Sequence, residues 1–273
     1  MQKTKCSILL FLCFFLVLSS KAQIPDGYYN SVIGKSGESL RFALHKIIKD
    51  HIEFPYTNKN TDTWDILKET DRDTINQDNV ILFYSGWSVN AAQEYNNGKG
   101  WAREHVWAKS HGSFDTDIGA GTDLHHLRPT DISVNRARKN VDFDIGGNLY
   151  LDNDGPTQCK YDNDSWEPRD KVKGDVARML FYMAVRYEGD KDEPDLELVD
   201  AVNTYYLNES GIGYHGKLST LLKWHKADPV DDSEMNRNNI IYSYQKNRNP
   251  FIDHPEFAEM IWNLSAEKLS KEN

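Results

Sequence analysis

The forty residues from Trp101 to Asn140 constrain the fold of this chain more than any other stretch. They begin with Arg103, Glu104 and His105 in succession, and they end in a cluster of amides and cations. Neighbouring residues on a β-strand point to opposite faces. Glu104 and His105 can therefore share one site only where the backbone bends, as it does at the end of a strand. Demanding local geometries of this kind concentrate at functional sites.

The second half of this stretch predicts a strand followed by a helix. Leu124 to Leu127 is a short run bounded by glycines before it and by a proline after it, which favours a strand. Thr130 or Asp131 can then cap a helix. On that helix Asn135 and Arg138 are spaced i, i+3 and lie on one face. The whole stretch is predicted to form a strand, a loop, a second strand and a helix.

The motifs REHVWAKSHG and GTDLHHLRPTDISVNRARKN resemble those of the endonuclease I family of secreted, metal-dependent nucleases. The resemblance implies a ββα-metal core, also called the His-Me finger. It further implies that Glu104 and Asn135 bind the divalent ion and that His105 is the general base. It does not fix the arginine that contacts the scissile phosphate, because the loop between the two motifs varies in length. The candidates for substrate binding are Arg103, Arg128 and Arg138.

The resemblance extends over most of the chain, from about Tyr28 to Trp262. It includes the segment GDVARMLFYMAVRY and the later segment NRNPF. The REHVWAKSHG and GTDLHHLRP segments are most similar to the secreted ribonuclease branch of the family. We therefore expect residues 23–273 to form a single α+β domain, mostly helical, around a small ββα-metal core.

Residues 1–22 have the pattern of a secretion signal. Two lysines precede an apolar run from Ile8 to Leu18, and Ser20-Lys21-Ala22 is a small-x-small cleavage site. A membrane anchor is the alternative, but this run is far shorter than the ~20 apolar residues that a spanning helix needs. We expect cleavage after Ala22 and a secreted protein, extracellular or periplasmic. The mature chain then keeps only Cys159, so it has no internal disulfide.

The charge distribution limits how nucleic acid can be held. The whole chain has a net charge of −10, and loss of the signal with its three lysines makes this more negative. A strongly acidic protein is a poor general binder of polyanions. Residues 99–140, in contrast, hold more Lys and Arg than Asp and Glu. We expect a local cationic groove and a bound ion, not a broad basic face, to contact the phosphates.

Outside this stretch the sequence predicts mainly helices. A helix that carries Leu40 to Ile48 is expected to pack on the core, with His45 and His51 at the surface. Val80 to Tyr84 has the pattern of a buried strand, and Asp142 to Asp164 that of solvated turns. The remaining expected helices are a deeply buried one from Val172 to Tyr187, then Leu218 to Lys226 and Asp231 to Tyr244. On the buried helix, structural ion pairs are expected for Asp175, Arg178 and Arg186.

These residues predict a hydrolytic mechanism. A neutral His105 would take a proton from water. Glu104 and Asn135 offer only oxygen ligands, which suit Mg²⁺ or another hard divalent ion such as Mn²⁺ or Ca²⁺. The implied products carry 5'-phosphates and 3'-hydroxyls. We expect a monomer with no membrane contact that cuts RNA, and secondarily DNA, with little sequence preference, because contacts to phosphate do not read bases.

Two other classes of function compete with this interpretation. The histidines at 105, 111, 125 and 126 suggest a secreted zinc hydrolase such as a peptidase. However, HExxH is absent, and adjacent residues His125 and His126 would face opposite sides of a strand. The second alternative is a non-catalytic nucleic-acid-binding module on the same fold. Such a module would need only the cations, whereas this chain also has the Glu, His and Asn together.

Overall fold

The structure, a computed structural model, describes residues 24–202 and 208–262. The α-helices in these ranges are α1 Gly37–Ile48, α2 Thr63–Thr70, α3 Ile132–Arg138, α4 Lys173–Arg186, α5 Leu218–Ala227, α6 Asp232–Gln245, α7 Pro250–Asp253 and α8 Glu256–Ile261. The strands are β1 Asn79–Ile81, β2 Ser88–Asn90, β3 Trp101–His105, β4 Leu127–Asp131, β5 Asp142–Phe143, β6 Asn148–Asp152, β7 Gly155–Tyr161, β8 Ser165–Glu167, β9 Asp195–Leu198 and β10 Ile212–His215. The predicted α+β fold, richer in helix than in strand, is confirmed.

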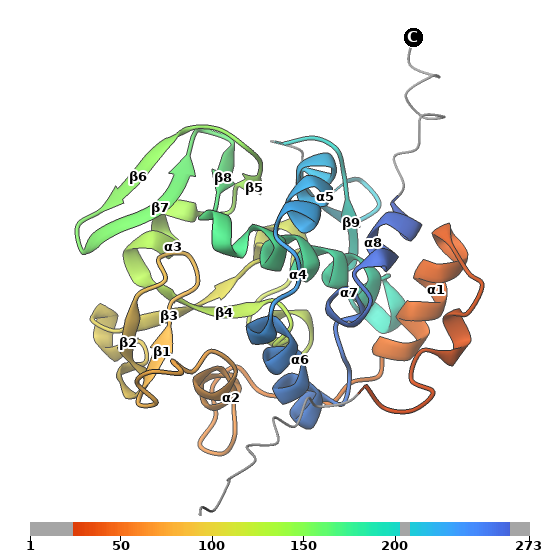
Figure 1. The fold of residues 1–273 in the computed structure, drawn as a ribbon, viewed down its shortest axis with the longest axis horizontal. Coiled ribbons are helices and arrows are strands. Elements are labelled where there is room, and N and C mark those ends of the chain that lie inside the picture. The colour runs from red at the N-terminus through yellow and green to blue at the C-terminus, as the bar shows by residue number, and fades with distance from the viewer. Residues whose placement is uncertain (1–23, 203–207, 263–273) are drawn as a thin grey trace, which may run out of the picture.

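The predicted ββα unit is formed by β3, β4 and α3. The two strands pair antiparallel, with Glu104 opposite Arg128 and His105 opposite Leu127. The helix begins at Ile132, directly after β4 ends, and it packs on both strands (Figure 1). Glu104 and His105 are the last two residues of β3, so the prediction that they lie at a strand end is confirmed.

Helix α4 is the centre of the core. Every residue from Gly174 to Arg186 is buried, and the helix crosses the middle of the molecule in contact with α1, α5 and α7 (Figure 1). Its sequence is apolar around most of the helix circumference, which is the pattern of a helix surrounded by protein. The prediction of a deeply buried helix is confirmed.

The charged residues of α4 have structural partners. Arg178 binds both carboxylate oxygens of Glu234, at 2.6 and 2.5 Å. Arg186 binds both oxygens of Glu193, at 2.7 and 2.8 Å. Bidentate pairs of this kind satisfy several buried donors at once. The prediction of structural ion pairs is therefore confirmed for both arginines.

The interpretation of residues 142–164 as solvated turns was wrong. This segment provides β5, β6 and β7, which join β8 in a sheet of order β5-β8-β7-β6. Some of the glycines and aspartates there lie between the strands; Gly147, for example, has a φ of +79°, a conformation that favours glycine. On β7 the side chains of Thr157 and Cys159 are buried at alternate positions, and this short alternation was hidden by the polar composition.

The second strand of the ββα unit was predicted three residues too early. Leu124 to His126 form a turn, and β4 starts only at Leu127. Pro129 lies inside the strand, where its carbonyl accepts a hydrogen bond from the Phe83 amide at 2.8 Å. Asp131 is the N-cap of α3 and accepts from the Ser133 amide at 2.8 Å, which confirms one of the two predicted caps.

The placement of His45 and His51 at the surface was wrong, because both side chains are buried. His45 Nδ1 lies 3.0 Å from the Val185 carbonyl oxygen. His51 Nδ1 accepts a hydrogen bond from Arg186 Nε at 3.1 Å. Both histidines satisfy polar groups near the C-terminal end of α4, and a polar contact of this type gives no hydrophobic periodicity in the sequence.

The predicted strand Val80 to Tyr84 is shorter than expected. The pairing of β1 ends at Ile81, and Leu82, Phe83 and Tyr84 are buried outside any strand. The other predicted helices are confirmed as α1, α5 and α6. In the described part of the chain no helix is both long and apolar enough to cross a bilayer. The predicted signal, residues 1–22, lies outside the described residues.

Candidate active site

The end of β3 places Glu104 and His105 together in a nearly closed environment. Their exposed fractions are 3% and 8%. Burial of an ionisable group is costly unless specific partners satisfy it. The partners of each side chain therefore define what the site can do.

Glu104 is held by one hydroxyl and one cation. Tyr84 donates its hydroxyl to Glu104 Oε1 at 2.8 Å, and Arg138 Nε lies 3.3 Å from the same oxygen. Burial raises the pKa of Glu104 above its usual range, and Arg138 and the Tyr84 hydrogen bond offset this only in part. Among the described residues no other side chain pairs with this carboxylate. Both contacts thus involve Oε1, which leaves Oε2 as the oxygen suited to an external ligand.

The hydrogen bond of His105 defines its tautomer. Its Nε2 lies 2.9 Å from the carbonyl oxygen of Gly121. A carbonyl oxygen only accepts, so Nε2 carries the proton and Nδ1 keeps its lone pair. Burial, followed by the neighbouring His126, holds the pKa of His105 well below its usual range. The imidazole is therefore neutral at pH 7, with one nitrogen able to accept a proton.

Three rings fix the orientation of the His105 imidazole. Tyr56 stacks on it with ring centroids 5.7 Å apart and an interplanar angle of 18°. His126 and Phe114 pack against it at centroid distances of 5.5 and 6.4 Å. The ring therefore has little freedom to turn, and the Gly121 carbonyl keeps its position relative to Nε2.

Asn135 shares a face of α3 with Arg138. Arg138, three residues further along the helix, reaches the Glu104 carboxylate, and residues at i and i+3 share a helix face. Asn135 is half-buried. Within the described ranges its side-chain amide makes no hydrogen bond to protein. A half-buried amide oxygen without a protein partner is available to a ligand.

Arg103 is committed to packing. Its guanidinium donates to the Tyr56 carbonyl and to Thr63 Oγ1, the latter at 2.9 Å. It also stacks on the rings of Tyr56 and Trp64, with its central carbon 3.3 and 4.0 Å from the two ring centroids. These contacts bind the guanidinium to other residues of the fold.

The guanidinium of Arg128 points toward two aspartates, Asp71 and Asp175. Its Nε is 3.1 Å from Asp71 Oδ1, and a terminal nitrogen is 3.7 Å from Asp175. It forms part of the wall of a cavity of about 860 Å³ whose lining also includes Asp71, Phe83, Arg169 and Asp175. Glu104, His105 and Asn135 do not line this cavity.

Of the three predicted arginines, only Arg138 contacts Glu104 in the described structure. It is buried, and its two terminal nitrogens donate to the carbonyl oxygens of Lys139 and Val106 at 2.9 and 2.8 Å. Arg138 and Glu104 are thus in contact, His105 follows Glu104 at the end of β3, and Asn135 shares a face of α3 with Arg138. Arg103 is stacked on Tyr56, and Arg128, although directly opposite Glu104 in the hairpin, turns its guanidinium to Asp71.

Several partners of the site were not predicted. Tyr84 and Tyr56 belong to segments far from β3 in the sequence, and Gly121 acts through its backbone carbonyl. A tyrosine at the end of an apolar run gives no signal of a polar role. A backbone carbonyl has no side chain from which its function could be read.

Within residues 24–202 and 208–262, two other groups of potential metal ligands lie outside this site. His111, Asp142 and His215 are buried, with ligand atoms within 4.8 Å of one another. However, both ring nitrogens of His111 face backbone carbonyl oxygens, at 2.5 and 2.7 Å, which occupies the positions a metal would use. The second group is Asp131, Asp152 and Asp154, of which Asp131 already caps α3. Neither group meets the geometry of the predicted zinc-type alternative.

Asp142 allows a test of pH-dependent stability. Burial raises its pKa, but hydrogen bonds from His215 and the Gly216 amide outweigh this effect and hold the pKa at about 2. A depressed pKa stabilises the folded state above the unfolded pKa of ~3.9, and that stability is lost as the pH falls through about 2. We expect Asp142→Asn to lower the free energy of unfolding by ~2 kcal/mol at pH 7. Urea unfolding from pH 7 to pH 3 should show the difference shrinking below pH ~4; a constant difference would contradict this.

Comparison of this sequence with known proteins identifies its family. The family model of Endonuclease I matches residues 36–256. The chain belongs to the Endonuclease I family. It is 56% identical over 238 residues to the "Extracellular ribonuclease" of Bacillus subtilis (strain 168), which covers 87% of this chain and 78% of the relative. The protein of the same name from Bacillus amyloliquefaciens matches to the same extent.

A more distant family member is the "Endonuclease-1" of Buchnera aphidicola subsp. Baizongia pistaciae (strain Bp). It is 30% identical over 139 residues, 48% of this chain and 46% of the relative. The predicted resemblance to the endonuclease I family, and to its secreted ribonuclease branch, is thereby confirmed. The chain is an Endonuclease I nuclease, and neither the zinc hydrolase nor the non-catalytic module is favoured.

Proposed function

We propose that this Endonuclease I protein hydrolyses RNA, and secondarily DNA, with His105 as general base and with a divalent ion held by Glu104 and Asn135. The observation that carries this proposal is the tautomer of His105. Its Nε2 is committed to the Gly121 carbonyl at 2.9 Å, so the free Nδ1 can accept a proton from water.

The side chains at the site fit a hard divalent ion. Oε2 of Glu104 has no side-chain partner in the described structure, and the amide of Asn135 makes no hydrogen bond there. One carboxylate and one amide oxygen are the ligand types that Mg²⁺ prefers, and Mg²⁺ keeps its remaining positions for water and phosphate. We propose Mg²⁺ as the ion, with Mn²⁺ and Ca²⁺ as chemically similar substitutes.

The protein's own part in the reaction is proton transfer and orientation. Nδ1 of His105 takes a proton from the attacking water, and the resulting imidazolium keeps its Nε2–H bond to the Gly121 carbonyl. The partial negative charge of that oxygen stabilises the new cation. The ion, when bound, supplies neutralisation of charge on the phosphate and on the leaving oxygen. The products of this route are a 5'-phosphate and a 3'-hydroxyl.

Among the three candidate arginines, we propose Arg138 for the site. Its guanidinium lies beside Glu104, with Nε 3.3 Å from Oε1, and its positive charge favours the ionised carboxylate that a metal requires. Arg103 is stacked between aromatic rings, and Arg128 is paired with two aspartates. These two arginines support the fold around the site and do not contact substrate in this account.

The substrate class and the location follow from the relatives. Two proteins that are 56% identical to this chain are named extracellular ribonucleases, so we propose RNA as the first substrate and secretion as the destination. The hydrolytic route does not need the ribose 2'-hydroxyl as nucleophile, which keeps DNA available as a second substrate. Recognition through phosphate implies little sequence preference.

Removal of the metal tests this function directly. The purified mature protein should degrade matched RNA and DNA in Mg²⁺, lose activity in EDTA and regain it when Mg²⁺ is restored in excess. The reason is that His105 alone cannot neutralise the charge that develops on phosphate. Full activity in EDTA would contradict the proposal. Peptidase activity that appears when Zn²⁺ is added would instead support the zinc hydrolase.

A further inference from the structure

We infer that Asp123, a buried residue outside the reacting groups, is a positioning residue for His105. The inference rests on the proposed role of His105 as general base. Asp123 contacts neither the imidazole nor, in our account, the substrate. It fixes the two segments that hold the imidazole in place, one of which provides the Gly121 carbonyl and the other Tyr56.

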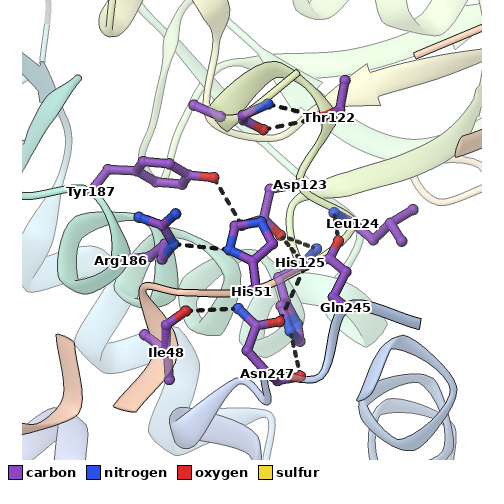
Figure 2. Close-up of polar contacts among 12 residues, drawn as sticks. Ile48, His51, Thr122, Asp123, Leu124, His125, Arg186, Tyr187, Gln245 and Asn247 are labelled. Atoms are coloured by element: carbon purple, nitrogen blue, oxygen red, sulfur yellow. Dashed lines mark hydrogen bonds and ion pairs between the residues drawn. The ribbon is translucent and has the colours of Figure 1, made fainter. Parts of the chain in front are cut away.

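Figure 2 shows the Asp123 carboxylate surrounded by polar groups from several segments. Oδ2 accepts from the hydroxyls of Tyr182 and Tyr187 at 2.8 and 3.0 Å. Oδ1 accepts from the His125 amide at 2.9 Å and from Gln245 Nε2 at 3.1 Å. A buried carboxylate that accepts four hydrogen bonds is firmly fixed, because each donor would otherwise be left unpaired in the interior.

The first segment is the 3₁₀ turn Ala120–Thr122, which ends directly at Asp123. Its middle residue, Gly121, provides the carbonyl that binds Nε2 of His105. The turn packs so closely on the chain at Asp115 that a Cβ on Gly121 would lie 1.7 Å from the Asp115 carbonyl oxygen. The carbonyl therefore lies two residues from the Asp123 carboxylate, in a turn that packs closely on the chain at Asp115.

The second segment follows α1 and leads from His51 to Tyr56. His51 is buried, with Nε2 3.8 Å from Asp123 Oδ2, and it points toward Asp123 in Figure 2. The next residue, Ile52, donates its amide to the Gln245 carbonyl at 2.7 Å, and the Gln245 side chain binds Asp123. Four residues later the chain places Tyr56 against the general base.

Asp123 therefore ties together both contacts that define the state of the general base. The carbonyl selects the Nε2–H tautomer, and the stacked tyrosine sets the ring plane. Burial raises the pKa of Asp123, but His51 and His125 outweigh it and hold the pKa below its usual range, so the anchor stays ionised at neutral pH. Loss of the anchor should loosen the imidazole without altering the metal ligands.

The test compares Asp123→Ala and Asp123→Asn with a matched control, Asn249→Ala. Asn249 is equally buried, and its side chain makes two hydrogen bonds, to the Arg178 carbonyl and from the Phe251 amide. Among the described residues no hydrogen bond joins this side chain to the groups around His105. Ring ¹⁵N spectra of selectively labelled, metal-free mature protein report the tautomer of His105. Steady-state kinetics on RNA, normalised to the folded fraction, report kcat and KM.

We expect Asp123→Ala to mix the two tautomers of His105 and to lower kcat by about 10- to 100-fold, the effect of a small misplacement of a catalytic group. KM and the Mg²⁺ dependence should stay unchanged. Asp123→Asn keeps the shape and one of the two acceptor oxygens, whereas its amide nitrogen cannot accept, so it should recover only part of kcat. The control should lose thermal stability only.

If Asp123→Ala does not fold, Tyr187→Phe gives the same test in milder form, because it deletes one donor hydroxyl. It should lower kcat and shift the tautomer signal in the same direction. A pure Nε2–H tautomer and an unchanged kcat in the folded variants would overturn the inference. That result leaves the general-base assignment intact, whereas a fully active His105→Ala would overturn the proposed function itself.

Discussion

Replacement of His105 by alanine should lower kcat by about 10² to 10⁴-fold, the typical loss when a general base is removed. The fold should change little, because the imidazole makes a single hydrogen bond, to the Gly121 carbonyl. Metal binding should also persist, since the proposed ion is held by Glu104 and Asn135 and not by the ring. This combination of lost turnover and retained metal affinity is specific to a base that acts on water.

Added imidazole separates the loss of a base from a damaged site. A small base in solution can enter the space left by the ring and should restore part of the activity of His105→Ala. A variant that is inactive because its site has collapsed would not respond. Full activity of His105→Ala without imidazole would contradict the assignment.

Glu104→Gln should weaken Mg²⁺ binding by more than about 100-fold. The residue provides the only formal negative charge among the proposed ligands, and even changes in the partners of a metal ligand typically cost 10- to 100-fold in affinity. Glutamine keeps the shape needed by Tyr84 and Arg138, which lie 2.8 and 3.3 Å from Oε1. Asn135→Ala removes a neutral ligand, so its loss should be smaller and partly overcome by raised Mg²⁺.

Isothermal titration of metal into both variants tests these roles. Glu167→Gln is a suitable control. Glu167 lies on β8, outside the ββα unit, and is a buried carboxylate that pairs with Lys160 of β7 and Lys173 of α4. It should leave Mg²⁺ affinity unchanged. If Glu104→Gln and Asn135→Ala bound Mg²⁺ as tightly as this control, neither residue could be a ligand.

Local sequence signals predicted the strand and the helix that carry the residues of the site. Arg103-Glu104-His105 predicted a strand end, and Asp131 predicted the start of the helix that carries Asn135 and Arg138. Both features depend on neighbouring residues, through strand alternation and through an N-cap hydrogen bond. Local rules therefore predicted the elements that carry these residues, whereas the roles of base and ligands were implied by the resemblance to the endonuclease I family.

Contacts between residues far apart in the sequence could not be predicted from such local rules. The Tyr84 hydroxyl reaches Glu104 across 20 positions, and His51 joins Asp123 from another part of the chain. A histidine in a helix reads as a surface residue unless its buried partner is known. For β4, the turn formed by Leu124 to His126 depends on the Asp123 anchor, so the strand begins later than its apolar residues suggest.

The three arginines illustrate the same limit at the site. All three lie within the ββα sequence and are equally plausible from composition. Their roles separate only in three dimensions: Arg103 stacks on Tyr56, Arg128 pairs with Asp71, and Arg138 reaches Glu104. Charge in a sequence thus predicts a cationic region, whereas the contact to the reacting groups is set by the fold.

The central claim is that water activated by His105 attacks the phosphodiester bond. Its most direct measurement is the structure of the cleaved ends of RNA digested in Mg²⁺ and ¹⁸O-labelled water. The account predicts 3'-hydroxyl ends and 5'-phosphates that carry the solvent oxygen, with the same ends on DNA. Fragments with 2',3'-cyclic phosphates and 5'-hydroxyls would show attack by the ribose hydroxyl and would contradict it.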